Sequence, residues 1–142
     1  GKIINVFHRV SAGWKDCRFT DDHYREGERF ASFPYRGKTF AVGLCGDLWT
    51  AGRPAEMRAL SADVVLWPVW CDYPAGEWNR SVKLEYAGQA GQCGTCVLLV
   101  NPCCKDPAAA DAATGGAVWF RNKEIVSELP AGTEGVLLTE IR

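Results

Sequence analysis

Two uninterrupted apolar runs in the middle of the chain constrain its fold most strongly. DVVLWPVW at residues 63–70 and TCVLLVN at 95–101 are typical of strands buried on both faces. The segments before each run, residues 53–61 and 76–94, predict helices, and Pro54 lies in the first turn of the earlier one. With the strand predicted at 38–45, this alternation favours an α/β fold with at least some parallel strand pairing.

The flanking segments predict further strands. Residues 2–10 alternate loosely between apolar and polar, and 29–35 and 38–45 read as a pair joined by a tight turn at Arg36-Gly37. After a loop at 102–116, three more runs are strand-like: 117–120, 123–129 and 134–141. Residues 11–29 predict a long loop of the kind that is often functional. We find no repeat and no linker, so we expect one domain over 1–142.

Composition excludes several classes of protein. The net charge is −1 without a block of like charge, so we expect neither nucleic-acid nor membrane-surface binding. No apolar run approaches the ~20 residues of a membrane span, and GKIINVFHRV does not resemble a signal peptide. Seven cysteines are an odd count, and 47% hydrophobic residues can build a core without disulfides. The sequence therefore predicts a cytoplasmic protein.

The stretch GLCGDLW, residues 43–49, is the strongest candidate for chemistry. Cys45 follows a buried strand and precedes Gly46, so the turn could present a thiolate and aim backbone N–H groups at an oxyanion. The alternative is that Cys45 is a small core side chain, as most free cysteines are. Ala41 and Gly43 share its face of the strand, which indicates close packing there. The residues alone leave both readings open.

Other candidates are weaker. The spacing of Cys93, Cys96, Cys103 and Cys104 argues against a zinc site, because Cys96 begins a strand and zinc ribbons usually present two separated CxxC knuckles. His8 and His23 could act as a base but fit solvated or structural positions better. Asp47 could orient a catalytic group or cap a turn. Several tryptophans lie near strand ends, where ligands of parallel sheets bind; core packing explains most of them, and we predict substrate contacts for Trp49 and Trp70.

The ordered set of motifs resembles the carbon–nitrogen hydrolase (nitrilase) superfamily. The matching stretches, in order, are GKTFAVGLCGDLW, PAEMRALSADVVLWPVW, a helix, TCVLLVN, GGAVWF and GVLLTEI. The resemblance covers nearly all of this chain but only about the second half of such an enzyme. It implies a mixed sheet forming half of a four-layer α-β-β-α sandwich.

The resemblance also implies a mechanism without metal or organic cofactor. Cys45 matches the nucleophile that attacks a small-molecule amide or nitrile to give a thioester, and the N–H of Gly46 matches an oxyanion donor. Arg9 stands where the family has a catalytic lysine, which is not a conservative exchange. The general-base glutamate would precede Gly1, and a loose alignment places Asp21 or Asp22 near an auxiliary acidic residue.

Half a sandwich would leave one sheet face bare. We therefore expect a homo-oligomer, or docking of that face on an N-terminal segment that precedes residue 1. Two other readings stay open: a catalytically degenerate relative that acts as a binding module, and a cysteine-rich metal-binding protein.

Overall fold

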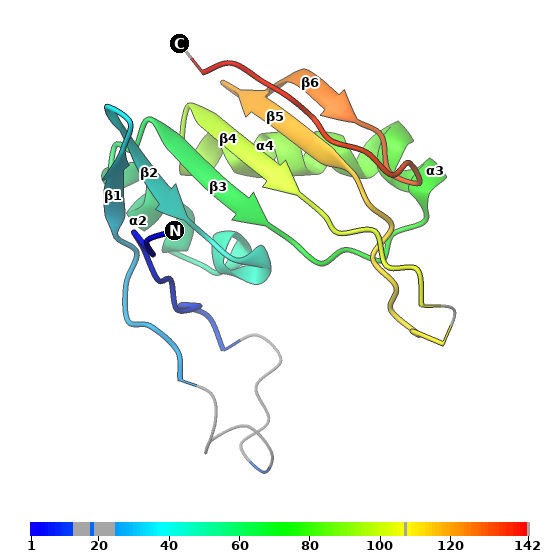
Figure 1. Ribbon diagram of the computed structural model, residues 1–142, viewed down its shortest axis with the longest axis horizontal. Coiled ribbons are helices and arrows are strands. Elements are labelled where there is room, and N and C mark those ends of the chain that lie inside the picture. Colours follow the sequence, from blue (N-terminus) through cyan, green and yellow to red (C-terminus); the bar gives the residue numbers. More distant parts are fainter. Residues whose placement is uncertain (13–17, 19–24, 107, 142) are drawn as a thin grey trace.

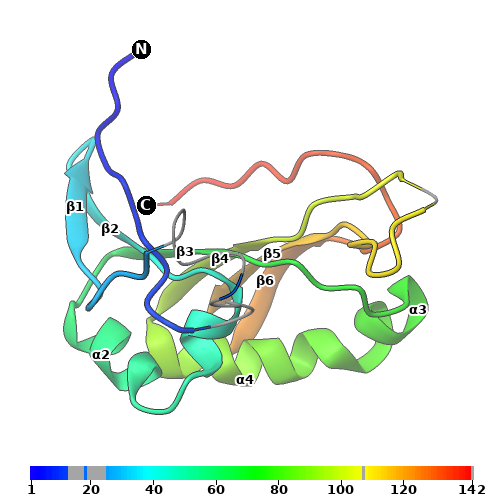
Figure 2. The ribbon, with the colours of Figure 1, turned by 90° about the horizontal axis from the view of Figure 1, so that it is seen from below.

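The structure is a computed structural model that describes residues 1–12, 18, 25–106 and 108–141. Its centre is one mixed sheet of six strands, ordered β1-β2-β3-β4-β5-β6. The helices cover one face of this sheet, as Figures 1 and 2 show. The strands are β1 Ser32–Tyr35, β2 Lys38–Val42, β3 Val64–Pro68, β4 Cys96–Val100, β5 Ala117–Arg121 and β6 Glu124–Leu129. The fold is α/β, with one helical layer and one sheet layer, which is half of the expected four-layer arrangement.

Strands β2, β3 and β4 are parallel, and the remaining pairs are antiparallel. The β1–β2 hairpin turns at Arg36 and Gly37, both with positive φ, as the sequence predicts. Helix α2, Arg53–Ala59, connects β2 to β3. From β3 the chain passes through α3 (Ala75–Glu77), the π-helical turn η2 (Trp78–Val82) and α4 (Lys83–Cys93) to β4. Both predicted helices and the parallel pairing are confirmed.

The core lies between the sheet and the helices. Alternate residues of the strands face it, among them Val65 and Trp67 of β3 and Val97 of β4. The helical side supplies Met57 and Trp78, which are also buried. This apolar layer fixes the register of the central strands, because a one-residue slip would turn the buried set to the opposite face.

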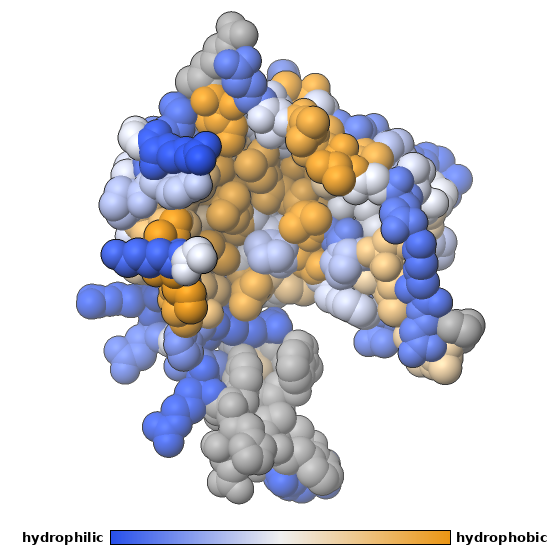
Figure 3. Space-filling model, viewed as in Figure 1, coloured by the Kyte–Doolittle hydropathy of each residue, from blue (hydrophilic) through white to orange (hydrophobic). Residues whose placement is uncertain are grey.

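The opposite face of the sheet is open and apolar. Leu66 and Leu98 are only half-buried there, and Val100 is 52% exposed. A cavity of about 730 Å³ lies over this face, and residues 133–139 of the C-terminal segment form part of its wall. Figure 2 shows that segment on the side away from the helices, and Figure 3 shows apolar side chains gathered over the sheet. The bare face expected of a half sandwich is present, so β3 and β4 are fully covered on one side only.

Two predicted strands do not form. Residues 2–10 are extended but outside the sheet, because the polar groups of residues 9 and 10 bond to Gly27 and to side chains of residues 47 and 53. Residues 134–141 run across the open face, where no strand edge is available for pairing. Val136 and Leu138 of this apolar run are exposed. Most of the predicted loop at 11–29 lies outside the described residues.

Among the described residues, no helix combines the length and apolarity needed to cross a bilayer.

A substitution at Gly43 tests the close packing that the sequence predicts beside Cys45. A Cβ at Gly43 would meet Leu48 Cδ2 at 2.7 Å, and Leu48 is fully buried. We expect Gly43→Ala to lower the unfolding free energy by about 1–3 kcal/mol through overpacking. Gly88→Ala in α4 is the matched control, since nothing lies within 4 Å and alanine favours a helix. Equal stability of the two variants in denaturant titrations would contradict this packing.

The alkaline stability of the fold depends on buried thiols. Burial raises the pKa of Cys93 from 9.0 to about 12. Above pH 9 the unfolded thiol therefore loses its proton while the folded one keeps it, so unfolding becomes easier as pH rises toward about 12. The contribution of Cys93 is at most about 1.4 kcal/mol per pH unit. Denaturant titrations across this window should show a shallower decline for Cys93→Ala than for wild type.

Cys103→Ala is the control for the alkaline series, since Cys103 is exposed in the folded chain. Burial likewise raises the pKa of Cys71, so we expect Cys93→Ala to reduce the slope without abolishing it. An unchanged slope in Cys93→Ala would show that burial of this thiol does not control the alkaline decline.

Candidate active site

Cys45 lies at the carboxyl end of β2, where the chain enters the 3-10 turn η1, Cys45–Trp49. Its φ is +43°, in the left-handed region that side chains other than glycine rarely adopt. Such a conformation costs on the order of 1–3 kcal/mol and is concentrated at functional sites. The half-buried Sγ of Cys45 lies 3.9 Å from the carbonyl oxygen of Trp70, beyond the end of β3. The sulfur is thus held at the edge where two parallel strands end.

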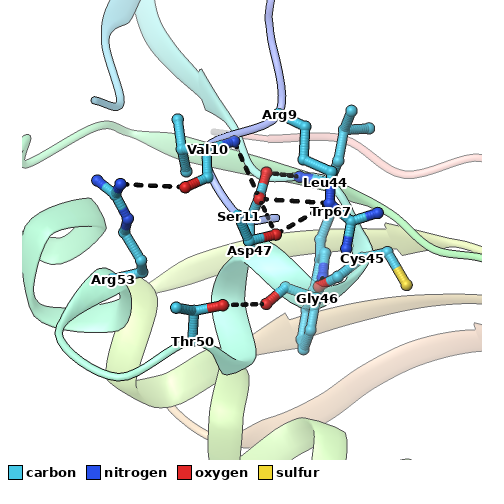
Figure 4. Close-up of polar contacts among 10 residues, drawn as sticks. All are labelled: Arg9, Val10, Ser11, Leu44, Cys45, Gly46, Asp47, Thr50, Arg53 and Trp67. Atoms are coloured by element: carbon cyan, nitrogen blue, oxygen red, sulfur yellow. Dashed lines mark hydrogen bonds and ion pairs between the residues drawn. The ribbon is translucent and has the colours of Figure 1, made fainter. Parts of the chain in front are cut away.

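Hydrogen bonds on both sides of Cys45 hold this strained turn. Asp47 Oδ2 accepts the backbone N–H of Leu44 at 2.9 Å, which closes the start of η1. Trp67 Nε1 donates to the carbonyl oxygen of Cys45 at 3.0 Å. Thr50 Oγ1 donates to the carbonyl of Gly46 at 2.9 Å, as Figure 4 shows. The conformation of the nucleophile candidate is therefore set by its neighbours.

The second oxygen of Asp47 holds the N-terminal segment against the same turn. Oδ1 accepts the backbone N–H of Val10 at 3.1 Å and the hydroxyl of Ser11 at 2.7 Å. From α2, Arg53 Nη2 donates to the carbonyl of Val10 at 3.0 Å (Figure 4). Asp47 is fully buried, so these donors compensate for the desolvation of its carboxylate. A segment far from Cys45 in sequence is fastened beside it.

These hydrogen bonds to Val10 and Ser11 place Arg9 next to the turn. Its Nε donates to Ser11 Oγ at 2.9 Å and lies 3.8 Å from Asp47 Oδ1, and its side chain is 13% exposed. The terminal Nη2 lies beside Gly46, only 2.9 Å from where a Cβ would be. In Figure 4 the Arg9 side chain reaches from the N-terminal segment toward the turn that carries Cys45. The structure thus brings Cys45, Gly46 and Arg9 together; their chemical roles stay predictions.

Several solved structures share this arrangement of elements. A glutamine-dependent NAD+ synthetase from Acinetobacter baumannii superposes on 94% of this chain with a TM-score of 0.76 and 21% identity. Nit3 of Saccharomyces cerevisiae, a member of branch 10 of the nitrilase superfamily, matches 80% with a TM-score of 0.60 and 19% identity. The chain has the fold of the nitrilase superfamily. Its sequence resemblance to that superfamily is thereby confirmed at the level of fold.

An amidase of the same fold gives a third comparison. A mutant of the amidase from Nesterenkonia sp. AN1, with the acetamide moiety of fluoroacetamide on its active-site cysteine, matches 78% of this chain at 20% identity and a TM-score of 0.57. This chain spans 25% of the synthetase and 41% each of Nit3 and the amidase. Neither a protein-family model nor a curated protein matches the sequence.

Two partly exposed tryptophans lie on the chain segments next to Cys45 in this nitrilase-type fold. Trp49 is 44% exposed and packs edge-on against Tyr86 at 5.0 Å between ring centroids. Trp70 is 48% exposed, and its Nε1 donates to the carbonyl of Asp111 at 2.7 Å. Both tryptophans predicted to contact substrate thus lie near Cys45 with part of their surface open, and their contact with substrate stays a prediction.

A second thiol near this edge went unnoticed in the sequence. Cys71 is buried, and its Sγ lies 3.0 Å from the hydroxyl of Tyr86. Burial raises the pKa of both groups, so both stay protonated at neutral pH. Asn101 accepts the backbone N–H of Cys71 and donates to its carbonyl, each at 2.9 Å. Cys71 therefore belongs to the rigid wall beside the site.

The remaining candidates lie apart from this site. Within residues 1–12, 18, 25–106 and 108–141, no group of three or more His, Cys, Asp or Glu side chains could hold a metal ion. Cys93 and Cys96 are buried in the fold, whereas Cys103 is exposed. His8 is exposed on the N-terminal segment. The other predicted candidates, His23, Asp21 and Asp22, lie outside the described residues.

Asp47→Asn tests the network that holds the site. The amide would present an NH2 group either to the Leu44 N–H or to the Val10 N–H and Ser11 hydroxyl, so a buried donor would lose its acceptor. We expect a loss of about 1–3 kcal/mol in unfolding free energy. Asp63→Asn is the matched control, because Asp63 accepts two bonds from Thr39 at the surface, where water replaces them. Similar losses for the two variants would contradict a special role for Asp47.

Proposed function

We propose that this chain forms the nucleophile-bearing part of a carbon–nitrogen hydrolase that acts on non-peptide C–N bonds of small amides or nitriles. The observation that supports this most is the strained φ of +43° at Cys45, maintained beside a partly buried arginine. A structural cysteine gains nothing from such a conformation, whereas a nucleophile at a sharp turn gains an exposed sulfur and nearby N–H donors. The nitrilase-type fold supports the same class of reaction.

In the proposed reaction the Cys45 thiolate attacks the carbonyl carbon of an amide. The oxygen that becomes negative is stabilised by the N–H of Gly46 and by the guanidinium of Arg9. The C–N bond then breaks, the amine leaves with the proton that came from the thiol, and a thioester remains. Water attacks the thioester, the C–S bond breaks, and the acid and the free thiol are released.

The proton transfers need a general base, which we propose is a glutamate from the part of such a hydrolase that this chain does not span. The open sheet face supports a related proposal, namely that a further segment of the protein or a second copy of the chain covers it. Trp49 and Trp70 are proposed to flank the acyl or amine group of the substrate. No metal or organic cofactor takes part in this scheme.

A catalytically degenerate binding module is the second candidate. Its supporting observation is that Arg9, in place of the family's lysine, is already engaged by Ser11 and Asp47. An arginine fork with two partners is less free to follow a developing charge than a single ammonium group. The two candidates differ in whether Cys45 forms a covalent bond with an amide.

Fluoroacetamide separates these two functions. We expect mass spectrometry to find one acetamide group on Cys45, as on the active-site cysteine of the Nesterenkonia amidase mutant. Cys45→Ser should abolish the modification, whereas Cys103→Ser, which removes an exposed thiol, should not. Ammonia release is measured in parallel with short amides and with glutamine, because the synthetase is glutamine-dependent by name. Labelling of exposed cysteines alone, with Cys45 unmodified, would refute the hydrolase proposal.

A further inference from the structure

Gly46 has no backbone reason to be glycine. Its φ is not among the positive values of the chain, so an L side chain would fit its conformation. The obstacle is a neighbouring side chain: a Cβ at this position would lie 2.9 Å from Arg9 Nη2, the one atom outside the turn itself that comes within 4 Å among the described residues. The space that a side chain would occupy is filled by the end of the guanidinium.

The other end of the Arg9 side chain is fixed. Nε contacts Ser11 and Asp47, and Asp47 is in turn held by the backbone of Val10 and Leu44. Both contacts are made by Nε, which leaves the terminal nitrogens Nη1 and Nη2 without a part in them. Nη2 lies beside Gly46, in the turn that follows β2. Because the guanidinium is planar and rigid, fixing Nε leaves the fork few positions, and the one observed passes over Gly46.

We propose that Arg9 and Gly46 form a matched pair that places a guanidinium N–H donor beside the Cys45 thiol and selects electrophiles with negative charge there. The inference rests on the proposed function, whose site it deepens. The missing side chain of Gly46 has a positioning role, because it acts through Arg9 and is separate from the proposed role of the Gly46 backbone N–H. A lysine at position 9 would end in a single nitrogen, so no planar guanidinium would fill the space beside Gly46.

Alkylation with a charged and a neutral reagent tests this pairing without requiring turnover. Iodoacetate and iodoacetamide differ in the carboxylate, so a guanidinium beside the sulfur favours the former. At each cysteine, the rate of modification by iodoacetate is divided by the rate with iodoacetamide, both measured by peptide mass spectrometry. The ratio at Cys45 is then divided by the ratio at the exposed Cys103 of the same protein. We expect this normalised ratio to be about fivefold in the wild type, corresponding to one close charge in water.

The variants then locate the effect. Gly46→Ala should lower the normalised ratio toward one while the protein stays folded, because the clashing atom belongs to the Arg9 side chain and not to the backbone, so the guanidinium is displaced and the turn is kept. In Arg9→Lys, adding Gly46→Ala should change the ratio little, which is the signature of coupling. Arg9→Gln should bring the ratio near one by removing the charge. Gly76→Ala, an exposed glycine with nothing within 4 Å, should match the wild type.

A normalised ratio near one in the wild type, or one that Gly46→Ala leaves unchanged, would overturn the inference. The inference would also be overturned if Gly46→Ala lowered the normalised ratio equally in the wild-type protein and in the Arg9→Lys variant. Gly46 would then act through the turn alone. These outcomes are separate from the hydrolase proposal, which fails on the absence of fluoroacetamide addition even where the charge preference is as expected.

Discussion

The candidate site depends on one buried carboxylate. Asp47 accepts hydrogen bonds from the strand end at Leu44 and from Val10 and Ser11 of the N-terminal segment, with no exposure of its own. A buried charge persists only when donors surround it, so the same contacts that satisfy Asp47 also define the turn and dock the segment. Asp47 thereby links the N-terminal segment that carries Arg9 to the turn that carries Cys45, and Arg53 supports this link through the carbonyl of Val10.

The sheet and its packed core support the hydrogen-bond network around Asp47. Parallel strands β2 and β3 end at the same edge, and their carboxyl ends bring Cys45 and Trp70 together. The helices bury one face of the sheet, so the strain at Cys45 is supported by a packed core. The other face of the sheet remains apolar and open.

The sequence predicted those features that short-range patterns encode. The buried apolar runs with helices between them predicted the parallel strands at the centre of the sheet. The order of motifs around Cys45 led to the hypothesis that Arg9 and Gly46 belong to the same site as Cys45. The strands expected at 2–10 and 134–141 were wrong because a strand-like composition does not specify a hydrogen-bonding neighbour. The roles of Ser11 and Cys71 were missed because contacts between distant segments leave no local signal. For Ser11 the available hint was its position two residues after Arg9, on the same side of an extended chain.

The central claim is that the structure poises Cys45 for attack instead of merely burying it. Competitive labelling of the native protein with limiting iodoacetamide at neutral pH tests this claim most directly. Cys45 is half-buried and Cys103 is exposed, so accessibility alone would favour Cys103. Modification of Cys45 before Cys103 is the result predicted here. Modification of Cys103 first, with Cys45 reacting only as the protein unfolds, would contradict the account.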